Sequence, residues 1–287
     1  GSTIYQLDTL VNSIKKVKRK RYDCIIGVSG GIDSCYALLK AKEAGLNPLA
    51  VHFDNGWNSN LSQTNIENLV NKLEVDLHTH VVDWTEYRSL LRSMMSAHVI
   101  DLELLMDNGM ISILYAMARK HRVKYILTGS NTSTEGMSMP TEWNWFKYDK
   151  KNIFDINRKF DNIKINTFPS FGMMDYYFNI KILRKKWVFF LDYFNYDKKS
   201  AEAELMSKTN FVPYEYKHYE SILTRFYQGY ILPNKFGVDK RKLHLSTLII
   251  SKQITRSEAI ESLKTSPYSS IDTLNEDRKY FLKNREN

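Results

Sequence analysis

A short segment of small and polar residues, SGGIDS beginning at Ser29, has the composition of a phosphate-binding turn. Gly30 and Gly31 lack Cβ atoms, so backbone N–H groups there can approach an anion closely. Ser29 and Ser34 add hydroxyl donors. Asp33 would repel a phosphate unless a cation lay between them, and Mg²⁺ is commonly held by one or two carboxylates together with phosphate oxygens. The segment therefore predicts a site for a magnesium-bound polyphosphate.

The spacing of the glycines separates this segment from two other phosphate-binding loops. The Walker pattern places a lysine directly after its second glycine, and no lysine follows Gly31. The dinucleotide pattern G-x-G-x-x-G does not fit Gly27, Gly30 and Gly31 either. A phosphate loop of a third type is therefore expected.

The elements that position this turn alternate between strands and helices. Short apolar runs rich in β-branched residues predict buried strands, and amphipathic spacing predicts the helices between them. We expect strands at 22–28, 47–56, 76–84 and 124–131, and helices at 33–44, 62–75, 85–97 and 107–121. This alternation predicts an α/β fold in which a parallel sheet carries helices on both faces. The turns at 29–34, 53–58 and 128–135 should then converge at the carboxyl edge of the sheet.

The pattern changes after residue 136, where aromatic and polar residues follow with weak periodicity. We interpret 131–146 as an acceptor loop in which Trp143 either stacks on a ligand or packs between two parts of the protein. From about residue 173 the pattern is mainly helical and rich in Tyr and Phe. We therefore predict a leading helix at 1–19, a sheet domain at 20–170 and a mainly helical C-terminal region at 171–287.

These motifs resemble those of a known superfamily. SGGIDS after an apolar strand is similar to the PP-loop of the ATP pyrophosphatases, which have a Rossmann-like fold and cleave ATP between its α and β phosphates. With the loop, the segments PLAVHFDNGWNS, YILTGSNTSTEG and RFYQGYILPNKFGVDKR resemble the N-acetyl sugar amidotransferases of the WbpG and PseA type, over roughly residues 20–262. Members of that family usually carry a cysteine-rich zinc segment upstream, which this sequence does not contain.

The resemblance implies a reaction that depends on ATP and Mg²⁺ and converts a sugar N-acetyl group into an acetamidino group. Adenylation of the amide oxygen gives an imidate, ammonia attacks its carbon, and AMP leaves. The acceptor would be an acetamido sugar, free or nucleotide-linked, in bacterial surface-polysaccharide or flagellar-sugar biosynthesis.

The resemblance also distributes roles over the chain. ATP would be bound by Ser29, Gly30, Gly31, Asp33, Ser34, His52, Phe53, Asp54, Gly129 and Ser130. Mg²⁺ would be held by Asp33 and Glu135, and the acceptor by Asn131, Glu135, Trp143, Lys217 and Arg225. We expect catalytic roles for Asp33, Glu220, Lys240 and Arg241. His218 and His244 have the chemistry of proton carriers, but the sequence shows no partner for either.

The source of ammonia is constrained by the two cysteines of the chain. Cys24 lies within a predicted strand and Cys35 within a predicted helix, whereas a glutaminase needs an accessible nucleophilic cysteine. We therefore expect ammonia to come from a separate glutaminase, in a pair similar to the two subunits of imidazole glycerol phosphate synthase.

The location follows from two further patterns. No apolar run approaches the length of a membrane span, and the first residues have no secretion pattern. A cytoplasmic protein without a membrane partner is expected.

Two other functions fit parts of the sequence. The net charge of +9 and the basic run KKVKRKR at 15–21 fit a PP-loop enzyme that adenylates a tRNA base. Thiolating members of that group often use paired cysteines, which are absent here, so we do not expect a nucleic-acid partner. A non-catalytic module would bind ATP without releasing AMP, and the intact Ser, Gly and Asp positions of the loop argue against it.

Overall fold

The computed structural model of the chain describes residues 2–16, 21–215 and 218–286. Within them lies a five-stranded sheet of order β3–β2–β1–β4–β5, in which each neighbouring pair is parallel. The strands are β1 (Cys24–Gly27), β2 (Pro48–Asp54), β3 (Asp76–Val81), β4 (Tyr125–Thr128) and β5 (Lys186–Phe189). The first four coincide with the predicted strands, each being shorter than its prediction.

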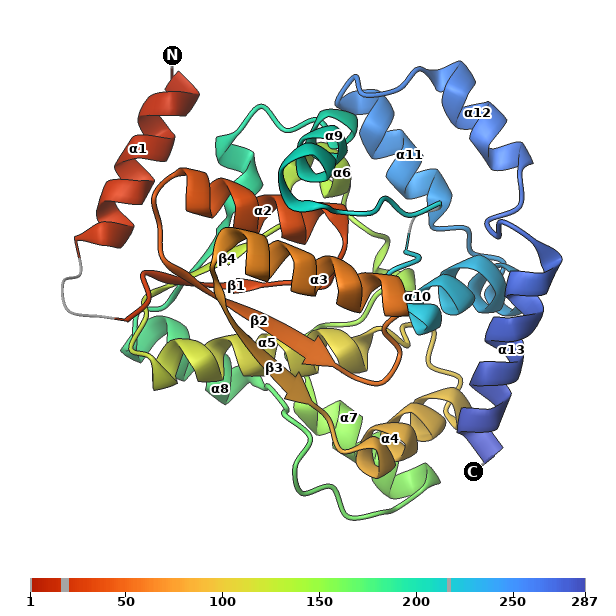
Figure 1. The fold of residues 1–287 in the computed structure, drawn as a ribbon. Helices are drawn as coiled ribbons and strands as arrows, with labels where there is room; N and C mark the ends of the chain where they lie inside the picture. Colours follow the sequence, from red (N-terminus) through yellow and green to blue (C-terminus); the bar gives the residue numbers. More distant parts are fainter. Residues whose placement is uncertain (1, 17–20, 216–217, 287) are drawn as a thin grey trace.

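Helices cover both faces of the sheet (Figure 1). The side chains of β1 alternate between the faces: Ile25 packs with α4 and α5, whereas Cys24 and Ile26 pack with α2 and α3. All three are fully buried, as expected for a central strand of a parallel sheet. The predicted α/β fold is thereby confirmed. The bounds are α2 (Ile32–Glu43), α3 (Asn60–Leu73), α4 (Trp84–Ser96) and α5 (Leu104–Lys120).

The fifth strand was not predicted. β5 pairs in parallel with β4, with Lys186 opposite Tyr125, and it forms one edge of the sheet. Four residues with half-exposed or exposed side chains give too weak a pattern to stand out from the surrounding helical periodicity. The division that we predicted at residue 170 therefore does not follow the sheet.

The remaining described segments are mainly helical, in line with the predicted C-terminal part. One helix, α7, lies where only weak periodicity was expected; it packs Ile153, Phe154 and Ile156 against the core. The helices are α1 (Ser2–Lys15), α6 (Thr132–Glu135), α7 (Lys150–Phe160), α8 (Met173–Tyr177), α9 (Lys198–Thr209), α10 (Ile222–Phe226), α11 (Arg241–Ile250), α12 (Arg256–Lys264) and α13 (Ile271–Glu286). The 3₁₀ and π segments are η1 (Thr141–Trp143), η2 (Phe178–Ile182), η3 (Phe190–Tyr193) and η4 (Tyr227–Phe236). None of the helices in the described ranges has the length and apolar character needed to cross a bilayer.

The C-terminal region is anchored at the carboxyl edge of the sheet by backbone hydrogen bonds. The turn after β2 receives it: the N–H of Ser59 donates to the carbonyl of Glu220 at 3.0 Å. The N–H of Ile222 donates to the carbonyl of Trp57 at 2.8 Å. This turn is therefore covered by the C-terminal region, whereas the turns after β1 and β4 remain open to a common cavity.

Candidate active site

The loop between β1 and α2 is shaped by its own hydrogen bonds. The Oγ of Ser34 accepts from the N–H of Ser29 at 3.1 Å and donates to the carbonyl of Gly31 at 3.2 Å. The N–H of Gly31 donates to the Oγ of Ser29 at 3.3 Å. Gly31 is also the N-cap of α2 and offers no side-chain cap. The first N–H groups of the helix are thus left for an anion, where the helix dipole favours negative charge.

Gly30 is required by both its conformation and its surroundings. Its φ of +85° lies in the left-handed region, which favours glycine. A Cβ atom there would lie 2.8 Å from both the Cβ and the carbonyl oxygen of Ser62 on α3. The hydroxyl of Tyr214 donates to the Gly30 carbonyl at 2.7 Å and fixes the peptide from the other side. The backbone of the loop at Gly30 is therefore held in place from both sides.

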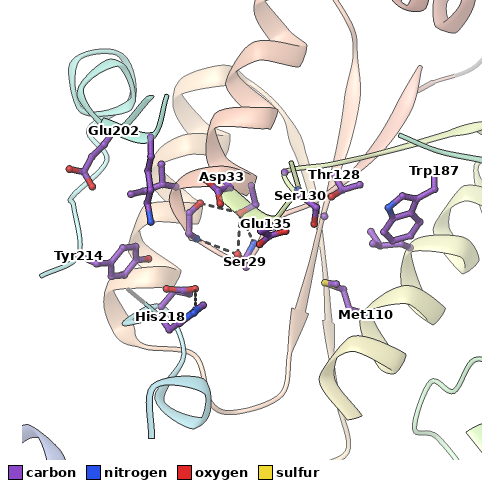
Figure 2. A pocket seen from close by; sticks show the side chains of 18 of the residues that line it. Ser29, Asp33, Met110, Thr128, Ser130, Glu135, Trp187, Glu202, Tyr214 and His218 are labelled. Carbon is purple, nitrogen blue, oxygen red and sulfur yellow. Dashed lines mark hydrogen bonds and ion pairs between the residues drawn. The ribbon is translucent and has the colours of Figure 1, made fainter. Parts of the chain in front are cut away.

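The loop opens onto a cavity of about 360 Å³ (Figure 2). The turn after β4 forms a second wall, and Trp187 of β5 and Lys198 of α9 contribute from beyond the sheet domain that we predicted. This size suits a small-molecule ligand. Of the residues predicted to bind or react, the cavity collects Ser29, Gly31, Asp33, Ser34, Gly129, Ser130, Glu135 and Glu220.

The two open turns pack against each other through Gly129. A Cβ atom on Gly129 would lie 2.5 Å from the carbonyl carbon of Asp33 and 2.6 Å from the N of Ser34. Any larger residue would push the turn after β4 away from the first turn of α2. The close approach brings Ser130 to the loop, as the predicted convergence of these strand ends requires.

Asp33 has a partner that the sequence did not suggest. The hydroxyl of Tyr196 donates to the Asp33 carboxylate through a short hydrogen bond. Burial and the negative charge of Asp33 raise the pKa of Tyr196, so its phenol stays protonated and remains a donor. Tyr196 therefore holds the orientation of the carboxylate at the mouth of the loop.

The donor set fits the Mg²⁺ ion that the loop implies. The carboxylates of Asp33 on α2 and Glu135 on α6 both line the cavity. Over the described residues, no cluster of three or more His, Cys, Asp or Glu side chains forms a preassembled metal site. Mg²⁺ in proteins is commonly held by one or two carboxylates, and phosphate oxygens and water complete its coordination.

The residues at the end of β2 do not line this cavity, contrary to the predicted nucleotide contacts. His52 is buried, and its Nδ1 lies 2.9 Å from the Val28 carbonyl. Burial lowers the pKa of His52, so the ring is neutral. Phe53 is buried in the core beneath α5, and Asp54 caps its own turn through the N–H of Gly56 at 2.9 Å. The C-terminal region covers this strand end, which explains the difference.

Three predicted cations of the C-terminal region, Arg225, Lys240 and Arg241, line a second cavity of about 250 Å³. Arg225 makes a bidentate ion pair with the buried Asp277 of α13, with both N–O distances at 2.6 Å. Lys240 pairs with Glu103 at 2.8 Å. Burial alone would raise the pKa of Glu103, but the lysine outweighs it and the pKa is lowered. These two cations are thus already neutralised within the fold.

The third predicted cation is tied in the same way. Arg241 pairs with Asp239 at 2.9 Å and donates to the carbonyl of Thr265 at 2.7 Å. His244 also lines the second cavity. None of Arg225, Lys240 and Arg241 lines the loop cavity, so their predicted roles require a ligand that reaches the second cavity.

Three predicted acceptor contacts have different outcomes. Asn131 is buried and caps α6, accepting from the N–H of Thr134 at 2.9 Å. Trp143 packs half-buried against the core and lines neither cavity, which is the packing alternative considered from the sequence. Lys217 lies outside the described residues.

Several cavity residues were missed by sequence reasoning. Lys198 and Glu202 come from α9, and Tyr214 comes from the segment after it. Tyr196, just before α9, does not line the cavity but contacts Asp33, which does. They belong to no recognisable motif, and their segment runs alongside α2 only because α9 packs there. The one signal available was the abundance of tyrosine after residue 173.

Comparisons with protein families agree with this division of the site. Residues 220–286 match the family described as "LPS biosynthesis protein WbpG-like, C-terminal domain". Residues 23–140 match the queuosine biosynthesis protein QueC. The predicted resemblance is confirmed. The chain joins a PP-loop domain of the ATP-utilising type to a WbpG-like C-terminal domain.

Solved structures were also compared. An NMN synthetase from Francisella tularensis is 15% identical, with a TM-score of 0.39, over 74% of this chain and 97% of that chain. An NH₃-dependent NAD synthetase from Campylobacter jejuni is 14% identical, with a TM-score of 0.39, over 91% and 95% of the two chains. A search of curated proteins finds no match.

Proposed function

We propose that the protein is an ATP-dependent amidotransferase that converts the N-acetyl group of a bacterial surface sugar into an acetamidino group. One observation carries the proposal: Glu220, the first residue of the WbpG-like segment, lines the same cavity as the PP-loop. The family-specific C-terminal segment thus contributes a carboxylate to the cavity in which the loop would bind ATP. The description of the matched family, with its LPS biosynthesis proteins, supports a sugar acceptor.

The chain's own residues supply what the first half-reaction needs. An amide carbon is a poor electrophile, and the reaction makes it reactive by attack of the amide oxygen on the α-phosphorus of ATP, with loss of pyrophosphate. N–H groups of the loop and the hydroxyls of Ser29 and Ser34 would hold the departing pyrophosphate. Asp33 and Glu135 would hold Mg²⁺, which stabilises the charge on the phosphates when it is bound.

The acceptor would lie between the two cavities, which meet at His218. Its acetamido group would face the loop, and its sugar and any phosphate or carboxylate would extend towards Arg225, Lys240 and Arg241. The guanidinium groups suit a carboxylate or phosphate even while paired, because each carries several N–H donors.

The test is a product assay on the purified chain. The protein is incubated with MgATP, ammonium chloride and a panel of acetamido sugars that includes UDP-linked diacetamido uronic acids and free and CMP-linked nonulosonic acids. We expect AMP and pyrophosphate together with one sugar in which NH replaces O. Omission of Mg²⁺ should abolish the reaction, and Asp33→Asn should slow it on the order of a hundredfold.

Other outcomes would redirect the assignment. AMP release that requires tRNA would favour the RNA-modifying function, for which the net charge of +9 is the supporting feature. ATP binding without AMP release, with every acceptor and with a glutaminase partner added, would leave a nucleotide-binding module and contradict the proposal.

A further inference from the structure

His218 occupies a position that no other described residue shares: it lines both the loop cavity and the second cavity. It lies two residues before the WbpG-like segment begins. Figure 2 shows its ring at the loop cavity, joined by a dashed line to a neighbouring carboxylate. The imidazole of His218 therefore lies where a ligand in the loop cavity would meet a ligand in the second cavity.

The backbone of His218 is held in an unfavourable conformation. Its φ of +66° is in the left-handed region, which non-glycine residues occupy at a cost. The segment is fixed on its far side by the hydrogen bonds of Glu220 and Ile222 to the turn after β2. The fold thus overcomes a local strain to keep this side chain at the junction.

A carboxylate fixes the chemistry of the ring. The Nδ1 of His218 lies 3.5 Å from the Oε1 of Glu220, whose side chain is 23% exposed. Burial alone would raise the pKa of Glu220, but its interaction with His218 outweighs burial and lowers it. An ionised carboxylate beside Nδ1 favours the tautomer protonated there, which leaves the Nε2 lone pair as a proton acceptor.

Other charges surround this pair and set the conditions of any pH measurement. The titratable or charged groups that line the same cavities or interact with His218 or Glu220 are Glu103, Asp33, Glu135, Lys198, Glu202, Tyr214, Glu215, Arg225, Lys240, Arg241 and His244. Carboxylates predominate on the loop side, and cations on the other side. The cationic nitrogen that forms when ammonia attacks, and the proton that it then releases, are thus favoured on the loop side.

We propose that His218 is the catalytic base of amide-to-amidine transfer, an inference that rests on the proposed function. Ammonia's lone pair attacks the carbon of the adenylated acetamido group and forms the new C–N bond, while the π electrons of the imidate C=N bond move to the sugar nitrogen and return to re-form the double bond when AMP leaves. The attacking nitrogen then loses one proton to Nε2 of His218. The C–O bond to AMP breaks, AMP leaves with the electron pair, and the amidine remains. The proton passes from His218 to solvent or to the basic amidine.

The test separates the two half-reactions in His218→Asn, since asparagine also tolerates the left-handed backbone. The probe is a UDP-linked diacetamido uronic acid, or the member of the panel that reacts. Acceptor-dependent exchange of labelled pyrophosphate into ATP reports adenylation, and sugar mass reports transfer. We expect exchange within about threefold of the wild type but transfer slower by about a hundredfold.

The pH dependence of the transfer rate is a second test, because the loss of a residue with only a structural role would not change its shape. Transfer rates are expressed per free ammonia, so that the titration of ammonium is removed. The wild-type rate should fall at low pH, where an imidazole is protonated, and the variant should lose this limb. His98→Asn is the matched control, because His98 also has a positive φ, +54°, but is exposed and contacts Lys235 instead.

Three results would overturn the inference. Transfer unchanged in His218→Asn, or exchange and transfer lost in parallel, would remove the catalytic role while leaving the amidotransferase standing. Absence of acceptor-dependent exchange in the wild type would overturn the proposed function, and this inference with it.

Discussion

At the scale of single residues, the loop depends on a glycine that is constrained twice. Gly30 and Gly237 both have positive φ, +85° and +67°, but only Gly30 is crowded. A Cβ on Gly237 would meet nothing within 4 Å, whereas one on Gly30 would clash with Ser62. Substitutions at these two glycines therefore distinguish the cost of a left-handed backbone from the cost of a steric clash.

We expect Gly237→Ala to lower the free energy of unfolding by about 1 kcal/mol, the cost of a left-handed alanine, and to retain activity. Gly30→Ala should cost more and lose ATP binding, because the loop must move away from α3. Chemical denaturation and nucleotide titration would measure both effects. Equal costs with full activity in both variants would contradict the argument.

The loop could be predicted at this scale because close backbone approach needs particular residues in adjacent positions. The end of β2 could not, because His52 and Phe53 look the same in sequence whether a ligand or the C-terminal region covers them. Nor could the pairing of Arg225, since its partner Asp277 lies on a different helix. Long-range partners leave no local pattern.

At the scale of elements, α9 is joined to the helix that follows the loop by a network of charged groups. Glu204 accepts from Tyr36 and Lys40 of α2, each at 2.7 Å, and from Lys208 at 2.6 Å. α9 also contributes Lys198 and Glu202 to the lining of the loop cavity. The network therefore fixes the position of α9 relative to α2 and the loop that precedes it.

This network gives a prediction with a defined pH dependence. Burial alone would raise the pKa of Glu204, but the hydrogen bonds from Lys208, Lys40 and Tyr36 lower it from 4.5 to about 2. A lowered carboxyl pKa stabilises the fold above its unfolded value, and the contribution is lost as the pH falls through the folded value. Glu204→Gln should thus cost about 1 kcal/mol at neutral pH, after allowance for solvent screening.

The cost of Glu204→Gln should shrink as the pH is lowered from about 4.5 towards 2, since the wild type then loses the same charge. Thermal unfolding across this range would measure it. Glu261→Gln is the control, because Glu261 and its partner Lys264 are 71% and 66% exposed and should contribute almost nothing. A difference that stays constant with pH would mean that packing, not charge, joins α9 to α2.

The elements of the PP-loop half could be predicted because strand–helix alternation repeats there with clear turns. β5 could not, since a four-residue edge strand gains its stability from pairing with β4 and not from its own pattern. The contribution of α9 to the cavity could not be predicted for the same reason. Its place depends on tertiary contacts with α2.

At the scale of the whole molecule, the two halves combine into one site. The WbpG-like segment reaches the loop cavity through Glu220, and the second cavity opens beside it at His218. Neither half alone holds both the phosphate loop and the second cavity. Fold class follows from the first half, but the proposed reaction depends on how the second half is placed, which the sequence shows only through resemblance.

For the proposed reaction, the source of nitrogen depends on the two cysteines of the chain. Cys24 and Cys35 are the two cysteines, and both are fully buried. Burial raises the pKa of Cys24, and it raises that of Cys35 to about 12, so neither forms a thiolate near neutral pH. A glutaminase nucleophile must be accessible and activated. Neither Cys24 nor Cys35 is therefore placed to act as such a nucleophile in this structure.

We accordingly expect the double variant Cys24→Ala and Cys35→Ala to keep the wild-type rate with ammonium chloride, while losing some stability to the small cavities it creates. Neither protein should form product from glutamine alone, and both should do so equally when a glutaminase subunit is added. Product mass with each nitrogen source measures this. Glutamine-dependent product from the wild-type chain alone, lost in the variant, would show that a buried thiol becomes exposed during turnover and that no partner is needed.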